Sequence, residues 1–134
     1  MQAVGDTQTD PSVHSIFVIG EHQLAHDTTV LSVEGELDLA SAPDLKWALG
    51  DLQASAARHV VVDLAKVSFI DSTALGVLVG AQRALREGIR MAIACDDENV
   101  LRIFELTGLD CMFEIAPTLD QALEYVQGRT TAAG

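Results

Sequence analysis

Short apolar runs rich in Val and Ile alternate along the chain with segments in which apolar residues recur every three or four positions. The short runs have the length and the β-branched composition of strands. They lie at residues 15–19, 29–33, 59–64, 89–94 and 112–115. The run at 59–64 is nearly continuous, which is typical of a parallel strand covered on both faces. A polar turn is predicted at residues 20–27, and Gly35 is predicted to end the second strand.

Helical periodicity predicts a first helix that opens at Ser41. Ser41 suits an N-cap, Pro43 fits a first turn, and Asp44 complements the positive end of the helix. The predicted buried face consists of Leu45, Ala48, Leu49 and Leu52.

Three further helices are predicted from their caps and spacing. The second spans residues 72–87, with Gly88 as its C-cap. The third starts at Asp96 or Asp97 and stops at Gly108, and the last opens on a capping box of Thr118 and Gln121.

The resulting order, β-β-α-β-α-β-α-β-α, predicts an α/β fold with a mostly parallel sheet of four to five strands and about four helices. The first two strands are expected to form an antiparallel hairpin, and right-handed crossovers place the helices against the sheet. Residues 14–127 are predicted to form one domain. Residues 1–13 and 128–134 are polar and aperiodic, and we expect both to be flexible tails.

The charge balance narrows the classes of partner. The chain has 134 residues, with 20 acidic and 8 basic ones, and a net charge of −12. A surface this acidic repels phosphate backbones and anionic lipids, so we expect neither direct nucleic-acid binding nor membrane binding. The start of the chain lacks the features of a secretory signal, and no apolar stretch reaches the roughly 18 residues of a membrane span. A cytoplasmic location is therefore predicted.

Motifs for catalysis, cofactors and metals are missing from the sequence. No phosphate-binding glycine loop, GxSxG or HExxH is present. His22 and His26 have a spacing used by metal ligands, but they fall in the predicted turn, so no metal or cofactor is expected. Cys95 and Cys111 are predicted at opposite ends of parallel strands, beyond the ~7 Å limit for a disulfide.

The segment around Ser72 carries the clearest candidate chemistry. Asp71, Ser72 and Thr73 precede an apolar helix as an N-cap does, and a phosphate on Ser72 would meet free N–H groups at the positive helix end. Gly76 and Gly80 each cost the helix about 1 kcal/mol relative to Ala. With Thr73 and Arg83 they form a stripe of small side chains that permits another chain to approach. Packing of the glycines on the sheet remains an equal alternative.

Four blocks of sequence, in order, resemble the anti-sigma factor antagonists that consist of a STAS domain. They are VEGELD at residues 33–38, VVDL at 61–64, IDSTALGVL at 70–78 and RIFELTGL at 102–109. The resemblance implies a STAS-like single domain and a cytoplasmic bacterial switch without enzymatic activity. Such an antagonist binds an anti-sigma factor that is also a serine kinase, and thereby frees a sigma factor. Phosphorylation by that kinase ends binding, and a phosphatase resets the switch.

The resemblance also assigns residues. Ser72 matches the phosphoryl acceptor, and Asp38 matches a position near the partner face. The predicted partner-binding residues are Asp38, Asp71, Thr73, Gly76, Gly80 and Arg83. Thr73 and Ala74 replace the family's commoner Ser-Gly pair, which bears on which kinase docks. The oligomeric state, the particular sigma factor and the upstream signal stay open.

Two alternatives from other classes follow from the same sequence. The first is a STAS subunit that braces an ABC ATPase or a membrane transporter without phosphoryl transfer, a role for which the serine motif is unnecessary. The second is a small α/β enzyme or nucleotide binder, against which the missing phosphate loop argues.

Overall fold

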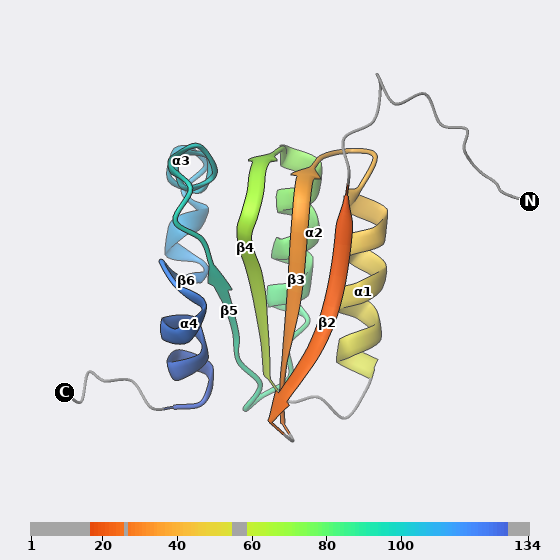
Figure 1. Cartoon of the computed structure of the whole chain (residues 1–134), viewed down its shortest axis with the longest axis vertical. Coiled ribbons are helices and arrows are strands. Elements are labelled where there is room, and N and C mark those ends of the chain that lie inside the picture. Colours follow the sequence, from red (N-terminus) through yellow and green to blue (C-terminus); the bar gives the residue numbers. More distant parts are fainter. Residues whose placement is uncertain (1–16, 26, 55–58, 129–134) are drawn as a thin grey trace, which may run out of the picture.

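The computed structural model describes residues 17–25, 27–54 and 59–128, which form one sheet and the helices that cover it (Figure 1). The elements in chain order are β2 (Val18–Ala25), β3 (Thr28–Leu37), α1 (Ala42–Ala54), β4 (His59–Ile70), α2 (Ser72–Arg83), β5 (Met91–Ala94), α3 (Glu98–Leu106), a 3-10 turn (Leu109–Cys111), β6 (Glu114–Ala116) and α4 (Leu119–Val126).

The sheet has five strands in the order β2-β3-β4-β5-β6, so each strand lies beside its neighbour in the sequence. β2 and β3 pair antiparallel, and the pairs β3–β4, β4–β5 and β5–β6 are parallel. The predicted α/β fold, with its initial antiparallel hairpin and mostly parallel sheet, is confirmed. Because α1 and α2 both return the chain between parallel strands, the two helices run in the same direction.

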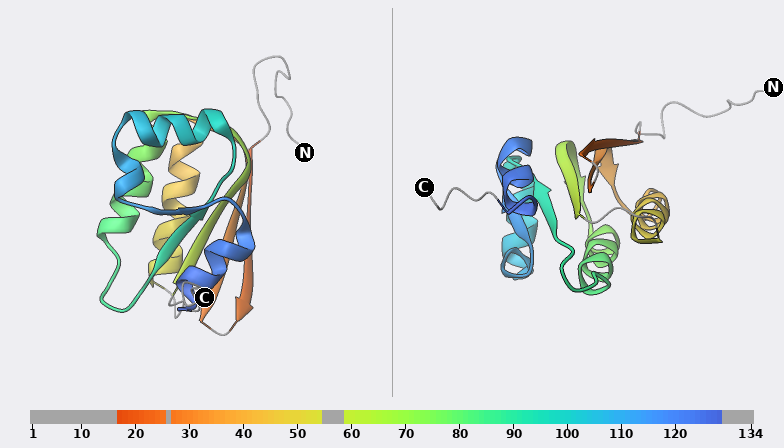
Figure 2. Two further views of the ribbon diagram at one scale, coloured as in Figure 1. Left: turned by 90° about the vertical axis from the view of Figure 1, so that its left-hand side faces the viewer. Right: turned by 90° about the horizontal axis from the view of Figure 1, so that it is seen from below.

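Apolar residues form a core on each face of the sheet. The larger core joins the sheet to α1, α2 and α3, and it includes Leu31, Val62, Leu78 and Phe104. The smaller core joins the opposite face to α4 through Val30, Val61, Ala122 and their neighbours. α1 and α2 therefore lie side by side on one face, away from α4 (Figure 2, right). Strand β5 and the first part of β4, Val60 to Val62, are buried on both sides, as the continuous apolar runs predicted.

The first hairpin is longer than predicted. The predicted turn at residues 20–27 is wrong, because β2 continues to Ala25, with Glu21 opposite Leu31 and Gln23 opposite Thr29. An edge strand with a solvent-facing side accepts polar residues, so polarity did not end the strand here. Gly35 does not end β3 either. It has a φ of 117°, and the pairing register with β4 shifts beside it, so the glycine forms a bulge inside the strand.

Strand β4 extends well past the predicted end at Leu64. It has 12 residues and pairs with β3 as far as Ile70, whereas β5 covers its other edge only from Val60 to Asp63. Beyond Asp63 the strand is partly exposed. The continuous apolar run from which the strand was predicted therefore stops before the strand ends.

Helix boundaries follow the predicted caps in most places. Asp97 caps α3, and the Thr118 hydroxyl accepts from the Gln121 amide at 3.1 Å, as the capping box predicted. The predicted end of α2 is wrong: the helix ends at Arg83 with Ala84 as its C-cap. Gly88, with a φ of 85°, instead lies in the turn that leads to β5.

The start of α1 differs in the role of Ser41. Its carbonyl accepts from the amides of Asp44 and Leu45, which begins the helix as expected. Its hydroxyl does not cap the helix but donates to the Glu36 carbonyl at 2.8 Å and accepts from the Asp38 amide. The predicted buried face is confirmed for Leu45, Leu49 and Leu52, with Ala48 only half-buried.

The predicted tails, residues 1–13 and 128–134, lie outside the described residues except for Gly128, as does His26 of the candidate metal pair. No helix in the described ranges is both long and apolar enough to span a bilayer.

The two cysteines are free thiols with opposite environments. Cys95 is buried, and desolvation raises the pKa of its thiol, although a backbone hydrogen bond from Asp97 opposes this; Cys111 is exposed. Because the thiolate is the reactive form, iodoacetamide at neutral pH is expected to alkylate Cys111 rapidly and Cys95 only on unfolding. Peptide mass spectrometry with and without urea checks this.

Mild oxidation should yield no Cys95–Cys111 bridge, and the appearance of that bridge would contradict the placement of the two thiols.

Candidate functional site

The carboxyl ends of β3 and β4 meet at one edge of the sheet and place the predicted site residues there. Leu37, the last residue of β3, pairs with Ile70, the last residue of β4. The Asp71 amide donates to the Leu37 carbonyl at 3.0 Å, which fixes the two loops together. Asp38 follows Leu37, and Ser72 follows Asp71. The structure thus brings Asp38 next to the Asp71-Ser72 segment, although more than 30 residues separate them in the sequence.

Asp71 is the N-cap of α2. Its backbone is extended, and its carboxylate accepts from the Ala74 amide at 3.0 Å. Ser72 is therefore the first residue of the helix, and its side chain is exposed. The amides of Ser72 and Thr73 belong to a first turn that has no intrahelical acceptor. A phosphoryl group on the Ser72 hydroxyl would lie against these amides and the positive helix end.

Asp38 organises the turn between β3 and α1. Its carboxylate accepts from the amides of Ala40 and Ser41, at 3.0 and 3.1 Å, and lies 3.2 Å from the Ser41 hydroxyl oxygen. Its carbonyl also accepts from the Ala42 amide at 2.8 Å. The side chain is half-buried, so it supports the loop beside Ser72 as well as bordering the exposed surface there.

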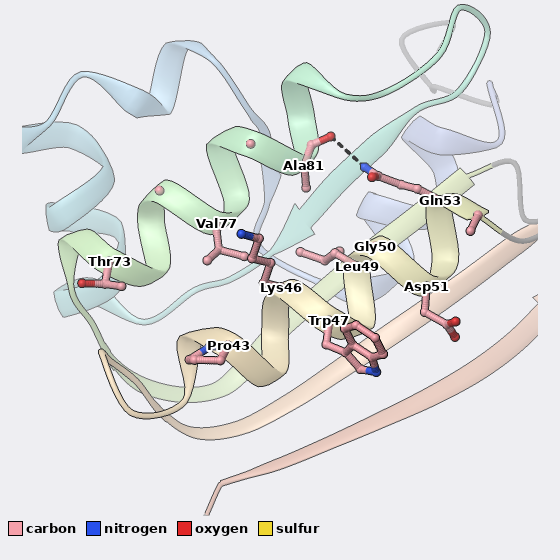
Figure 3. A pocket seen from close by; sticks show the side chains of 13 residues that line it. Pro43, Lys46, Trp47, Leu49, Gly50, Asp51, Gln53, Thr73, Val77 and Ala81 are labelled. Atoms are coloured by element: carbon pink, nitrogen blue, oxygen red, sulfur yellow. Dashed lines mark hydrogen bonds between the residues drawn. The ribbon is translucent and has the colours of Figure 1, made fainter.

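A groove of about 850 Å³ runs between α1 and α2 and reaches Thr73, the neighbour of Ser72 in the sequence (Figure 3). From α2 it is lined by Thr73, Gly76, Val77, Gly80 and Ala81, and from α1 by residues that include Lys46, Trp47 and Gly50. A Cβ added at Gly76 or Gly80 would meet nothing within 4 Å. The glycines therefore face the groove, so the alternative that they pack on the sheet is wrong.

Arg83, the last member of the predicted stripe, is exposed in the final turn of α2. Thr73, Gly76 and Gly80 form one continuous face along the groove, and Arg83 extends that face by one turn at helical spacing. The structure thus groups the predicted residues into two neighbouring sets: Asp38, Asp71 and Ser72 at the sheet edge, and Thr73, Gly76, Gly80 and Arg83 along α2.

Three exposed apolar residues near this surface were missed in the sequence. Trp47 is 81% exposed on α1, Leu39 is 71% exposed after Asp38, and Phe69 is 47% exposed before Asp71. One signal was available for Trp47, because it falls outside the periodic set of buried residues on its own helix. Leu39 and Phe69 gave no such signal. They lie in a loop and at the end of a strand, where no hydrophobic periodicity exists with which they could disagree.

The same surface shows no arrangement for metal chemistry: in the described ranges, no group of three His, Cys, Asp or Glu side chains is placed to hold a metal ion. What the geometry offers is an exposed hydroxyl at a helix N-terminus beside an apolar groove.

Removing the cap of α2 is expected to destabilise the protein moderately. Asp71→Ala loses the bond to the Ala74 amide and should lower the free energy of unfolding by about 1 kcal/mol. Asp71→Asn retains an acceptor at this position and should differ from wild type by only a few tenths of that amount. Urea unfolding monitored by circular dichroism compares them. Equal losses for both variants would contradict a capping role for this side chain.

Comparison with known proteins places this site in a family. The family model of the STAS domain matches residues 21–122. The anti-sigma-F factor antagonist RsfB of Mycobacterium tuberculosis is 32% identical over 99 residues, which is 74% of this chain and 81% of that protein. An anti-sigma-B factor antagonist of Listeria monocytogenes is 39% identical over 84 residues, which is 62% of this chain and 74% of that protein.

A solved structure agrees with the fold. The crystal structure of an anti-sigma factor antagonist from Mycobacterium paratuberculosis superposes with a TM-score of 0.76 at 31% identity, covering 85% of this chain and 95% of that one. The chain therefore belongs to the STAS domain family. Within the family it is similar to proteins named as anti-sigma factor antagonists, so the resemblance found in the sequence is confirmed.

Proposed function

We propose that this protein is an anti-sigma factor antagonist. It binds an anti-sigma factor that is also a serine kinase, frees the sigma factor held by that partner, and is switched off when the kinase phosphorylates Ser72. A serine phosphatase restores the binding form. The protein itself acts by binding and not as an enzyme, and it works in the cytoplasm.

The observation that carries this proposal is the position of Ser72. Its hydroxyl is exposed on the first turn of α2, directly after the Asp71 cap, so a kinase can reach it without unfolding the domain. The matched relatives named as anti-sigma factor antagonists favour this function over a subunit that braces a transporter. Leu39, which follows Asp38, and Phe69, which precedes Asp71 by two residues, are exposed and provide apolar area for a partner.

Phosphoryl transfer would change the surface without breaking the fold. The γ-phosphoryl of ATP forms a bond to the Ser72 oxygen, the bond to ADP breaks, and the hydroxyl proton passes to a base of the kinase. The product carries about −1.5 to −2 charges at neutral pH. The amides of the first turn stabilise this charge, while the Asp71 carboxylate opposes it. The effect on folding is therefore small, and the effect on binding arises where the partner meets the new charge.

Binding and phosphosite mapping together test the proposal. Each anti-sigma factor encoded by the host genome is purified and titrated against this protein by calorimetry, and the one that binds is then incubated with it and ATP. We expect a complex with one of them and phosphate on Ser72 in the tryptic digest. Absence of binding to all of them, or phosphate on another residue, contradicts the proposal. Ser72→Ala serves as the control and should bind without being phosphorylated.

A further inference from the structure

The turn between β3 and α1 lies at the same end of the sheet as the start of α2 (Figure 1). Its Leu39 is 71% exposed, whereas Leu37 before it and Ala42 after it are buried in the larger core. The Leu39 side chain therefore contributes little to folding. Single exposed leucines are common on protein surfaces, but this one is distinguished by a fixed backbone and by its distance from the phosphoryl acceptor.

Hydrogen bonds fix the backbone on both sides of Leu39. The Asp38 carboxylate accepts from the Ala40 and Ser41 amides, and the Asp38 carbonyl accepts from the Ser41 amide at 3.2 Å. Ser41 is 6% exposed, and its hydroxyl donates to the Glu36 carbonyl at 2.8 Å and accepts from the Asp38 amide at 3.0 Å. The leucine is thus presented from a rigid turn, so little backbone freedom remains to be lost when a partner covers it.

The same turn is tied to the segment that carries the acceptor. The Asp71 amide donates to the Leu37 carbonyl at 3.0 Å, and Leu37 pairs with Ile70 across the two strands. Leu39 lies two residues after Leu37, and Ser72 lies two residues after Ile70. With about 3.8 Å between successive Cα atoms and about 4.8 Å between paired strands, the Cα atoms of Leu39 and Ser72 are at most about 20 Å apart.

Transfer of a phosphoryl group to Ser72 requires the kinase to cover this end of the sheet. A protein interface of standard size covers about 800 Å² on each partner, which for a round patch is about 30 Å across. A patch of that width that includes Ser72 has room for Leu39. Among the described residues, Leu39 and Phe69 are the large exposed apolar side chains within two residues of the hydrogen bond that joins the two loops, and Phe69 is less exposed, at 47%. Leu39 is therefore the most accessible apolar contact that a kinase meets there.

We propose that Leu39 is the apolar anchor through which the anti-sigma factor recognises this protein. The side chain enters an apolar pocket of that partner, within about 20 Å of the hydroxyl that receives the phosphoryl group. The inference rests on the proposed function and adds to it the residue that sets affinity and the chemistry of the partner's pocket. Leu39 acts in docking and takes no part in the transfer, while Ser41 is a positioning residue that acts through Leu39 by fixing the turn.

Truncation of the leucine tests the anchor. Leu39→Ala should weaken binding to the anti-sigma factor about tenfold or more, as truncation of a central interface residue does. In phosphorylation assays with ATP, the same variant should raise KM by a similar factor and leave kcat within about twofold, because the contact is made before the transfer as well as during it. Leu39→Met keeps an apolar side chain of similar volume and should bind within about threefold of the wild type.

Leu24 provides a matched control at the other end of the sheet. It is 54% exposed and precedes Ala25, which pairs with Thr28 at the start of β3. The ten residues of β3 rise about 3.3 Å each, so they place Leu24 about 30 Å from the end that carries Leu39. Leu24→Ala should therefore bind like the wild type. Neither alanine variant should lower the melting temperature by more than about 3 °C, since both side chains are more than half exposed.

The role of the turn is tested at a matched loss of stability. Ser41→Ala removes the hydroxyl that holds the turn and should weaken binding several-fold although Leu39 is retained. Thr118→Ala removes the cap of α4 and should lower the melting temperature by several degrees without changing the affinity. Since Ser41 acts through Leu39, adding Ser41→Ala to Leu39→Ala should cost less than about twofold further.

The outcomes separate failure of the anchor from failure of the proposed function. If an anti-sigma factor binds the wild type and binds Leu39→Ala equally well, the anchor is wrong and the function stands. A lowered kcat with unchanged KM for Leu39→Ala, or an equal loss of affinity for Leu24→Ala, also overturns the anchor. If no anti-sigma factor binds the wild type, both proposals fail.

Discussion

Replacing Ser72 by Asp is expected to weaken binding to the anti-sigma factor by about a hundredfold, or about 2.7 kcal/mol, without lowering the melting temperature. The new carboxylate lies on the first turn of α2, where a negative charge is favourable for the helix, so stability is retained. The same charge lies on the surface that the kinase covers in order to reach Ser72, where it opposes binding. Calorimetric titration and thermal unfolding of the same preparations measure the two effects.

A matched control separates position from charge. Asn99 is exposed in the first turn of α3, so Asn99→Asp adds one negative charge to the N-terminus of a helix that does not line the groove. It should bind the partner like the wild type. Ser72→Ala should also bind but resist inactivation by ATP and the kinase. Similar affinities for Ser72→Asp and Ser72→Ala would refute the electrostatic mechanism, and a large fall in melting temperature for Ser72→Asp would point to unfolding instead.

Truncation of Phe104 is expected to have the largest effect on stability. Its ring is fully buried in the larger core and contacts Phe113 edge-to-face, with the ring centroids 5.7 Å apart. Few aromatic residues share the core, so neighbouring Val, Leu and Ala side chains have little means of filling the cavity. Phe104→Ala should lower the free energy of unfolding by about 3–5 kcal/mol. In a domain of this size that corresponds to a fall in melting temperature of more than about 10 °C.

Leu106 provides the control on the same helix. Its side chain is 76% exposed, so Leu106→Ala should change the free energy of unfolding by less than about 0.5 kcal/mol. Urea titrations of both variants give the comparison. If Phe104→Ala costs no more than Leu106→Ala, then α3 is not packed on the sheet as described.

The sequence predicted the structure correctly where that structure depends on residues adjacent in the chain. The N-caps Asp97 and Thr118 bond to amides in the first turn of their own helices, so the local sequence is enough to predict them. The apolar run at the start of β4 likewise predicts a strand from its own side chains. The errors occur where another segment decides the structure. Gly35 ends no strand because β4 continues beside it, and residues 20–25 form a strand because β3 supplies hydrogen-bonding partners for a polar segment.

The candidate site divides in the same way. The Asp71-Ser72 motif is contiguous, so its place at the start of α2 was predicted from a handful of residues. The groove is made by two helices from different parts of the chain, so the glycine stripe on α2 predicts at most one of its walls. The open space at Gly80 depends on how far α1 lies from α2. Sequence alone therefore left open whether the glycines pack on the sheet or face outward.

The measurement closest to the central claim is release of the sigma factor from its complex with the anti-sigma factor. A fluorescently labelled sigma factor is bound to the anti-sigma factor, and anisotropy is followed as this protein is added, either unmodified or stoichiometrically phosphorylated on Ser72. We predict that the unmodified protein lowers the anisotropy to that of the free sigma factor and that the phosphorylated protein leaves the complex intact. Equal release by the two forms would contradict the assignment of Ser72 as the switch.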